Sequence, residues 1–273
     1  HRPAPALKAV NVMVVGGGIA GMEAARVASL RGHRVTLHEK EETLGGTVNQ
    51  AAVPDFKKDL RRLLAWYERQ MEKTGVTVQM NSAMTKEKMA TLSPDVILVA
   101  TGAHPIVPPL PGMDQEMVIT AVDLLKGVKP AGNNVVVIGG GLAGCEVAIW
   151  LAEKNKKVTV VEMLPQVMAG GASVPTQVKM MTMDLMKRFG VEILTSTRLD
   201  HITKNEVALI SEDGALIKRA TDTVALAIGM TPETALADSL DSGPHRVYCM
   251  GDCRSPKNVM NAVWDAYEIA RFI

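Results

Sequence analysis

The stretch that decides the fold is Val12–Gly21, which reads VMVVGGGIAG. Its apolar run predicts a buried parallel strand, and the glycines that follow predict a tight turn into a helix. A second strand-like run, Val35–Leu37, is followed by Glu39, 18 residues past Gly21. A glycine-rich turn between strand and helix, with an acid at the end of the next strand, is typical of a dinucleotide-binding unit.

The same pattern occurs a second time. Val135–Gly144 reads VVVIGGGLAG, and Glu162 follows the run Val158–Val161. Each residue of the motif lies 123 positions after its counterpart (139 minus 16). One copy is weak evidence, because such turns also occur in α/β folds that bind nothing; two copies with both acids favour two nucleotide sites. Two sites in one chain suggest that electrons pass between two cofactors, and an empty second site is the alternative.

Each part of the motif has a physical role. The first glycine allows the turn, the second lets the backbone approach a pyrophosphate, and the third lets the helix pack on the sheet. The helix N-terminus offers free N–H groups and partial positive charge to the phosphates, while the carboxylate accepts hydrogen bonds from ribose hydroxyls. The predicted cofactor contacts are Gly16, Gly18, Ile19, Ala20, Gly21, Glu39 and Lys40 in the first copy, and Gly139, Gly141, Leu142, Ala143, Gly144 and Glu162 in the second.

A second repeat lies deeper in the chain. Asp95–Pro105 resembles Asp222–Pro232, 127 positions later (222 minus 95). Each half is therefore predicted to close with an apolar strand, a glycine turn (Gly102, Gly229) and a proline. Helices are expected over 56–73 and near 176–189, each before a short strand, at 76–78 and 191–194. After Pro232 a strand is expected to end in Gly-Asp at 251–252, with a helix from about residue 258.

Bulk composition excludes several classes of protein. The 273 residues are enough for about two domains. A net charge of +1 and an aromatic content of 3% argue against a nucleic-acid surface. No apolar run reaches the ~20 residues that a membrane span needs. Three cysteines are too few for a disulfide framework, so a cytoplasmic location is expected. The chain begins with His rather than Met, and a piece of a longer protein is expected.

The order of these motifs resembles the flavoproteins with two dinucleotide-binding domains, relatives of glutathione reductase and thioredoxin reductase, over nearly the whole chain. Gly21–Ala28 (GMEAARVA) and Gly251–Cys253 (GDC) are most similar to the C-terminal part of the 2,4-dienoyl-CoA reductase, enoate reductase and trimethylamine dehydrogenase group. Those enzymes carry an old-yellow-enzyme-like TIM barrel with FMN and a 4Fe–4S cluster in front. Because this sequence contains neither the barrel nor the cluster cysteines, FMN and 4Fe–4S are expected only in a preceding part.

The resemblance implies an α/β fold with two doubly wound Rossmann-like domains, the NAD domain (104–229) inserted into the FAD domain (1–103 and 230–273). FAD would occupy the first site and NAD(H) the second. The further residues it implies at the cofactors are Gly45 and Gly46 along the flavin, Thr101 and Gly102 crossing beside it, Gly251 and Asp252 at the ribityl chain or pyrophosphate, and Gly229 in the second domain. Two alternatives stay open: Gly45-Gly46 is only a turn, and Asp252 only caps a helix.

The implied function is an FAD-dependent NADH oxidoreductase module. Electrons would pass from NADH to FAD and onward to the iron–sulfur/FMN barrel, which reduces an activated C=C bond. The alternatives are a self-sufficient NADH-dependent flavin or quinone reductase and a non-catalytic nucleotide-binding domain. The expected partners are a nicotinamide nucleotide and the barrel, with neither nucleic acid nor membrane, and a homo-oligomer is left open. Glu162 favours NADH over NADPH, because its carboxylate would face the 2′-phosphate.

No catalytic side chain and no metal site are predicted. Hydride transfer needs stacking and orientation, while the cofactors supply the chemistry. The redox C-x-x-C and C-x4-C motifs of the reductases named above are missing. Cys249 and Cys253 form a C-x3-C that is interpreted as inert, although the turn between them could bring them near each other. Cys145 is interpreted as buried filler.

Overall fold

The structure, a computed structural model, describes residues 3–240 and 246–273. The chain divides into two compact units: unit 1 comprises the residues up to 104 together with 231–273, and unit 2 comprises 105–230. Each contains a parallel five-stranded sheet with helices, so the predicted α/β fold with two Rossmann-like sheets is confirmed. The chain passes between the units through β5 (Ala103–Pro105) and β14 (Met230–Pro232), which pair as a two-stranded sheet.

Unit 1 is built on a parallel sheet with the order β15-β4-β1-β2-β3. Its strands are β1 (Asn11–Val15), β2 (Arg34–His38), β3 (Thr77–Gln79), β4 (Val96–Val99) and β15 (Arg246–Cys249). The central strands β1 and β4 are buried on both faces, as their apolar runs predict. Register is continuous, so the carboxyl ends of β1 and β2 lie side by side.

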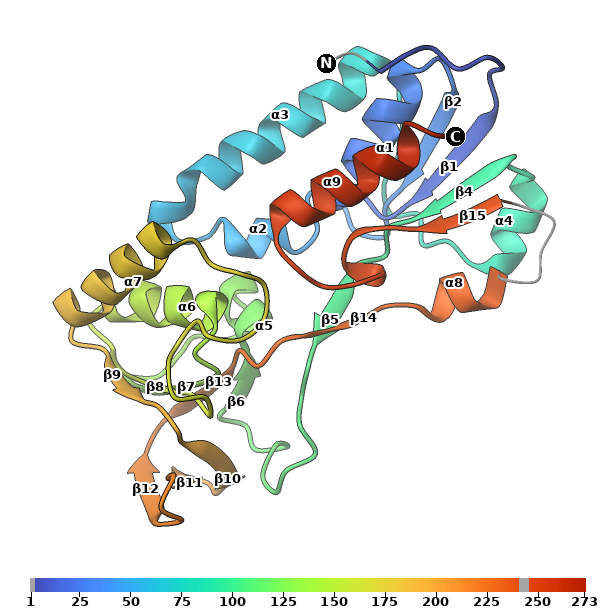
Figure 1. Cartoon of the computed structure of the whole chain (residues 1–273). Helices are drawn as coiled ribbons and strands as arrows, with labels where there is room; N and C mark the ends of the chain where they lie inside the picture. Colours follow the sequence, from blue (N-terminus) through green and yellow to red (C-terminus); the bar gives the residue numbers. More distant parts are fainter. Residues whose placement is uncertain (1–2, 241–245) are drawn as a thin grey trace. The chain divides into compact units, whose positions relative to one another are not determined.

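Helices cover both faces of this sheet. On one face lie α1 (Ile19–Leu30), α3 (Lys58–Thr74) and α9 (Val259–Ala270), with α1 in contact with the other two (Figure 1). Their apolar sides bury a core that includes Met22, which is fully inaccessible; such burial stabilises by roughly 1.5–3 kcal/mol. On the other face, α4 (Lys86–Leu92) and α8 (Ala235–Leu240) form a smaller core. Short helical turns complete the unit: α2 (Val48–Ala51), η1 (Asp55–Lys57) and η2 (Gly251–Cys253).

Unit 2 repeats the plan on one face and departs from it on the other. Its parallel sheet has the order β6-β13-β7-β8-β9, and α5 (Ala121–Lys126), α6 (Leu142–Ala152) and α7 (Thr176–Arg188) cover one face. The strands are β6 (Val118–Thr120), β7 (Asn134–Ile138), β8 (Lys157–Val161), β9 (Glu192–Leu194) and β13 (Thr223–Leu226).

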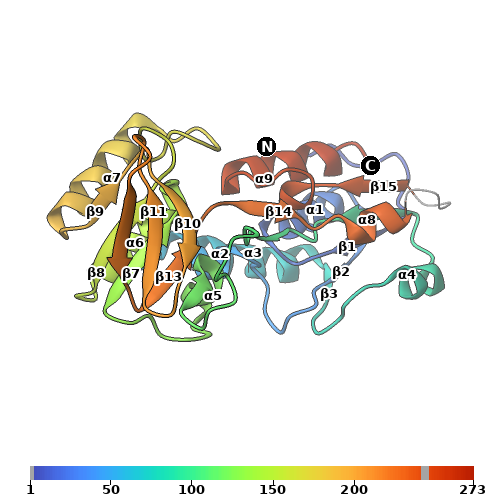
Figure 2. The ribbon, with the colours of Figure 1, turned by 90° about the horizontal axis from the view of Figure 1, so that it is seen from below.

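An antiparallel meander covers the second face of the unit 2 sheet (Figure 2). It consists of β10 (Arg198–Ile202), β11 (Glu206–Ile210) and β12 (Leu216–Ala220). The sequence motifs did not predict it. Buried apolar residues of β10 and β11 pack on those of β7 and β13 and form the second core of the unit.

The expected elements lie close to their predicted positions. The helix expected over 56–73 begins as the turn η1 and continues as α3, and the strand expected at 76–78 is β3, one residue later. The helix expected from about residue 258 is α9, which Asn258 caps by accepting a hydrogen bond from the Asn261 N–H at 3.0 Å. Within the described part of the chain, no helix is long and apolar enough to cross a bilayer.

Candidate functional site

The first glycine turn joins β1 to α1 through Gly16–Gly18. Gly16 has a φ of +105°, and an added Cβ would overlap the carbonyl oxygen of Ala100, the residue that follows the neighbouring strand β4. Gly21 packs as closely, against the carbonyl oxygen of Gly16. Gly18 differs, because a Cβ there would meet nothing within 4 Å, and no side chain caps the helix. The helix N-terminus therefore faces open space, which fits the pyrophosphate of a dinucleotide.

The second turn has the same construction. Gly139 has a φ of +105° and lies against the carbonyl oxygen of Ala227, as Gly16 lies against Ala100. Gly144 packs on Gly139, and Gly141 has open space where a Cβ would be. The helix α6 begins directly after Gly141 without a side-chain cap. Each unit thus contains a glycine turn with open space at its helix N-terminus, here called a cradle.

The two acids are held in place by backbone groups. In unit 1, Glu39 is 6% exposed; its Oε2 accepts from the Gly17 N–H at 2.6 Å and its Oε1 from the Glu41 N–H at 2.9 Å. In unit 2, Glu162 is 9% exposed and accepts from the N–H groups of Gly140 (2.7 Å) and Leu164 (2.8 Å). A carboxylate has about four acceptor positions, so each retains capacity for ribose hydroxyls. Backbone N–H groups of the same unit thus anchor each acid.

A loop closes over the middle glycine of each turn. In unit 1 the Gly45 N–H donates to the Gly17 carbonyl at 2.9 Å, and in unit 2 the Met168 N–H donates to the Gly140 carbonyl at 2.7 Å. Gly45 and Met168 are again 123 positions apart. The sequence reasoning missed Gly17, Gly140 and Met168, although extending the same offset beyond the glutamates would have found Met168.

In the part of the chain that the structure describes, the first loop also approaches the second glycine of its turn. Gly45 forms a β-bridge with Gly18, and a Cβ on Gly46 would lie 3.1 Å from the Gly18 Cα. The Gly45-Gly46 pair is therefore more than a surface turn, because its backbone lies against the predicted phosphate cradle.

The return segment also reaches the first turn. A Cβ on Gly251 would lie 2.7 Å from the Ala20 Cβ, so the Gly251-Asp252 turn packs on the first turn of α1. Asp252 accepts from the Lys257 N–H at 3.2 Å, and its burial raises the pKa of the carboxyl. Asp252 therefore organises the loop before α9, while Asn258 caps the helix itself.

The other predicted residues have varied surroundings. The Thr101 hydroxyl donates to the Glu233 carbonyl at 2.7 Å, and the Gly102 carbonyl accepts from the Glu233 N–H at 2.9 Å, which ties this crossing to the return segment. The Gly229 carbonyl accepts from the Ile106 N–H at 3.1 Å. The remaining side chains differ in exposure: Ile19 is buried, Ala20 and Leu142 are half-buried, and Lys40 and Ala143 are exposed.

The three cysteines are free thiols. Cys249 and Cys253 interact, as the turn between them allows: burial raises the pKa of Cys249, and the neighbouring Cys253 thiol adds to the effect. The Cys253 sulfur lies 3.1 Å from the Val99 carbonyl oxygen. Cys145 donates to the Gly140 carbonyl at 3.4 Å, and burial raises its pKa to about 12. Thiols with raised pKa values are poor nucleophiles.

Comparisons with known proteins place this geometry in a family. The family model described as pyridine nucleotide-disulphide oxidoreductase matches residues 10–266. The chain is 38% identical over 263 residues to the cinnamate reductase of Clostridium sporogenes, covering 96% of this chain and 39% of that protein. It is 35% identical over 268 residues to the NADH oxidase of Thermoanaerobacter brockii, covering 95% and 40%.

A solved structure supports the same family assignment. The chain is similar to 2-naphthoyl-CoA reductase in a complex with 2-naphthoyl-CoA, with a TM-score of 0.94 and 31% identity, over 99% of this chain and 41% of that one. The chain thus spans about two fifths of the length of the relatives it matches. The family match, residues 10–266, covers most of the chain. The chain therefore belongs to the pyridine nucleotide-disulphide oxidoreductase family, as a flavin-dependent module that uses FAD and NAD(H).

Proposed function

We propose that unit 1 binds FAD, that unit 2 binds NADH, and that the chain is the NADH-oxidising part of a longer reductase. The observation that supports this assignment is the difference between two otherwise equivalent turns. Among the described residues, only the first is approached by a second glycine pair and by the return segment. When bound, the nicotinamide supplies a hydride and the flavin accepts it; the protein supplies binding and orientation.

The residues of unit 1 would act together on FAD. The N-terminus of α1 offers N–H groups and partial positive charge to the pyrophosphate beside Gly18. Glu39, fixed by two backbone N–H groups, accepts from the adenosine ribose. Gly46 and Gly251 bring backbone close to the same helix end, and Asp252 stands beside it as an acceptor. We propose that residues 1–103 and 230–273 together form the FAD-binding domain.

The residues of unit 2 would hold NADH in the same manner. Gly141 leaves room for the pyrophosphate at the N-terminus of α6, and Glu162 accepts from the adenosine ribose. We assign residues 104–229 to this role. No side chain of this chain is assigned a proton transfer, because the bound cofactors would supply the redox chemistry.

For the intact protein, we propose onward transfer to a preceding barrel with FMN and a 4Fe–4S cluster, where an activated C=C bond is reduced. Two relatives support this: cinnamate is an α,β-unsaturated carboxylate, and 2-naphthoyl-CoA is an aromatic acyl thioester. The length of these relatives beyond the matched part leaves room for such a barrel. We also propose a reducing, cytoplasmic setting, which the three free thiols support.

A second candidate is a self-sufficient NADH-dependent flavin or quinone reductase. The similarity to an NADH oxidase favours it, because an NADH oxidase is not named for an organic acceptor. Anaerobic assays of the longer protein with NADH and cinnamate, compared with a soluble quinone, distinguish the two. Reduction of the quinone alone would support the second candidate.

The flavin assignment is tested by identifying the cofactor. The chain is reconstituted with an equimolar mixture of FAD and FMN, gel-filtered and denatured, and the released flavin is chromatographed. We expect FAD, because an anchored Glu39 and the Gly18 cradle serve an adenosine diphosphate arm that FMN lacks. A Glu39→Ala variant should retain less FAD. Release of FMN alone would contradict the assignment.

A further inference from the structure

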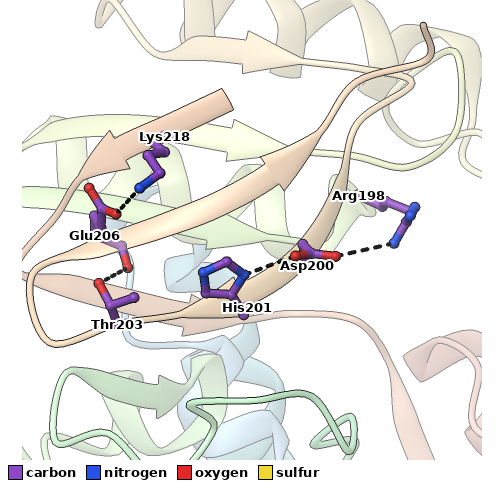
Figure 3. A network of polar contacts seen from close by, with 6 residues as sticks. All are labelled: Arg198, Asp200, His201, Thr203, Glu206 and Lys218. Carbon is purple, nitrogen blue, oxygen red and sulfur yellow. Dashed lines mark hydrogen bonds and ion pairs between the residues drawn. The ribbon is translucent and has the colours of Figure 1, made fainter. Parts of the chain in front are cut away.

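Unit 2 exposes two different kinds of side chain. On the meander, charged groups pair with one another, as in the ion pair of Lys218 with Glu206 at 3.1 Å (Figure 3). Directly after β8, by contrast, the apolar side chain of Met163 is 71% exposed. Single exposed apolar residues are common on protein surfaces, so the position of this one in the fold decides whether it has a role.

Met163 lies next to the ribose acceptor of the second dinucleotide turn. Glu162, the residue before it, is the carboxylate anchored by the Gly140 N–H. Because adenine is bonded to the ribose that Glu162 would hold, the next residue along the chain is within reach of the adenine ring. In unit 1 the exposed Lys40 has the equivalent position (163 minus 40 is 123, the offset of the repeat). The thioether therefore distinguishes the unit 2 site from its counterpart.

Hydrogen bonds fix the backbone on both sides of Met163. The Glu162 carbonyl accepts from the Thr197 N–H at 2.9 Å, and the Glu162 carboxylate accepts from the Leu164 N–H at 2.8 Å. The Leu164 carbonyl in turn accepts from the Ser196 N–H at 3.0 Å. The exposure of Met163 is thus a property of an ordered turn, which presents the side chain beside the ribose acceptor.

A thioether in this place suits an aromatic ring and is open to oxidation. Sulfur makes favourable contacts with aromatic rings, and the unbranched side chain adapts to them. With hydrogen peroxide, the sulfur lone pair attacks one peroxide oxygen, so that the S–O bond forms as the O–O bond breaks. The other oxygen takes up the proton and leaves as water; the sulfur loses two electrons and the peroxide gains them. The sulfoxide is polar, so covering it with adenine costs hydration.

We propose that Met163 is a peroxide-sensitive contact of the nucleotide site: its thioether packs on the adenine, and its oxidation by hydrogen peroxide weakens nucleotide binding. The proposal rests on the assignment of unit 2 to NADH. Met22 and Met89 are fully inaccessible, so burial protects their sulfurs. Met181 of α7 is 57% exposed and shares the accessibility of Met163 without following the ribose acceptor. Methionine sulfoxide is reversible enzymatically, so the effect is a switch rather than permanent damage.

The probe is NAD⁺, which carries the same adenosine half as NADH and donates no hydride. The FAD-loaded chain is treated with hydrogen peroxide, its sulfoxides are located by peptide mass spectrometry, and NAD⁺ binding is measured by calorimetry. We expect sulfoxide at Met163 and Met181 but not at Met22, and a loss of NAD⁺ affinity of about fivefold, the size of a thioether–aromatic contact. The flavin absorbance should stay constant, and methionine sulfoxide reductase should restore the affinity.

Two leucine variants assign the effect to one sulfur, each compared with its own untreated sample. Met163→Leu retains an apolar side chain that peroxide does not oxidise, so treatment should leave its NAD⁺ affinity as it was. Met181→Leu, the matched control, should lose affinity as the unmodified chain does. Unchanged affinity with sulfoxide present at Met163, or an equal loss in Met163→Leu, would overturn the proposal. Absence of NAD⁺ binding before treatment would overturn the nucleotide assignment of unit 2 and this proposal with it.

Discussion

The two glycine turns are alike in what holds the acid and differ in what covers the cradle. Glu39 and Glu162 each accept two backbone N–H groups, from the middle glycine and from the residue two positions on. At the position of the covering loop, unit 1 has Gly45 with a φ of +114°, and unit 2 has Met168 with a φ of +55°. An anchored ribose acceptor is thus common to both units.

The covering loops show what distinguishes the sites. Gly45 can bridge to Gly18 because it has no side chain and has a positive φ. The next residue, Gly46, also lies close to Gly18. Met168 is 3% exposed and fills core space instead, so unit 2 has no counterpart of the Gly45–Gly18 bridge among the described residues. This difference suits a retained cofactor in unit 1 and an exchanging nucleotide in unit 2.

The largest effect is expected from valine at the open cradles. Gly18 and Gly141 have φ values of −68° and −64°, which valine adopts without strain, and nothing lies within 4 Å of an added Cβ. Gly18→Val should lose FAD on gel filtration, and Gly141→Val should weaken NADH binding by on the order of a hundredfold, equivalent to about 2.7 kcal/mol.

Each valine variant is the control for the other. Gly18→Val should still bind NADH, and Gly141→Val should still retain FAD, with unchanged circular dichroism. Recovery of Gly18→Val with stoichiometric FAD would contradict the assignment of that cradle.

The second effect concerns the choice of nicotinamide nucleotide. Because Glu162 is anchored, it cannot swing away from an arriving 2′-phosphate. Two like charges ~5 Å apart at an effective dielectric of ~20 repel by roughly 3 kcal/mol. NADH should therefore be preferred by about a hundredfold, as measured by rapid flavin reduction with each nucleotide.

Two variants test whether the Glu162 carboxylate sets the choice of nucleotide. Glu162→Ala should narrow the NADH/NADPH ratio, whereas Glu39→Ala, its counterpart in unit 1, should leave the ratio as it is while weakening FAD. Equal use of NADPH by the unmodified chain, or an unaltered ratio in Glu162→Ala, would assign the choice to another residue.

A smaller effect is expected from pH, and it should be confined to unit 1. Burial lowers the pKa values of His33 and His38 below 6.5. The His33 Nδ1 accepts from the Val10 N–H at 3.3 Å, which requires the neutral ring. The unfolded chain then binds more protons than the folded chain, so the free energy of unfolding should fall as pH drops through 6.5.

Hydrogen exchange at pH 7.5 and 5.5 measures where this happens. Peptides of β1 and β2 should lose protection from exchange at the lower pH. The loss of protection should be smaller in the His33→Asn variant. Higher protection of these strands at pH 5.5 would show that the sign is wrong.

The smallest effect is expected from the thiols. The raised pKa values of Cys145 and Cys249 and the burial of Cys253 argue against a redox role. Replacing all three with serine should leave the rate of flavin reduction by NADH within a few-fold. Loss of that reaction in a folded, FAD-loaded variant would mean that a thiol takes part.

The parts predicted from the sequence are those whose signals are local. A β-branched run followed by glycines determines strand, turn and helix within ten residues, so both turns and both acids were found. The meander was missed because β12, with the sequence LIKRA, lacks an apolar run, although Asp213-Gly214 before it is a hairpin signal. Anchoring of Glu39 by Gly17 depends on two segments meeting in space, which no local pattern reports.

The central claim is that both turns work together, one holding FAD and the other delivering NADH. The most direct measurement is anaerobic mixing of the FAD-loaded chain with NADH while the visible flavin absorbance is followed. The account predicts that the band bleaches in the unmodified chain and that bleaching slows strongly in Gly141→Val, which retains its FAD. Persistence of the oxidised flavin spectrum, with FAD and NADH both shown to be bound, would contradict it.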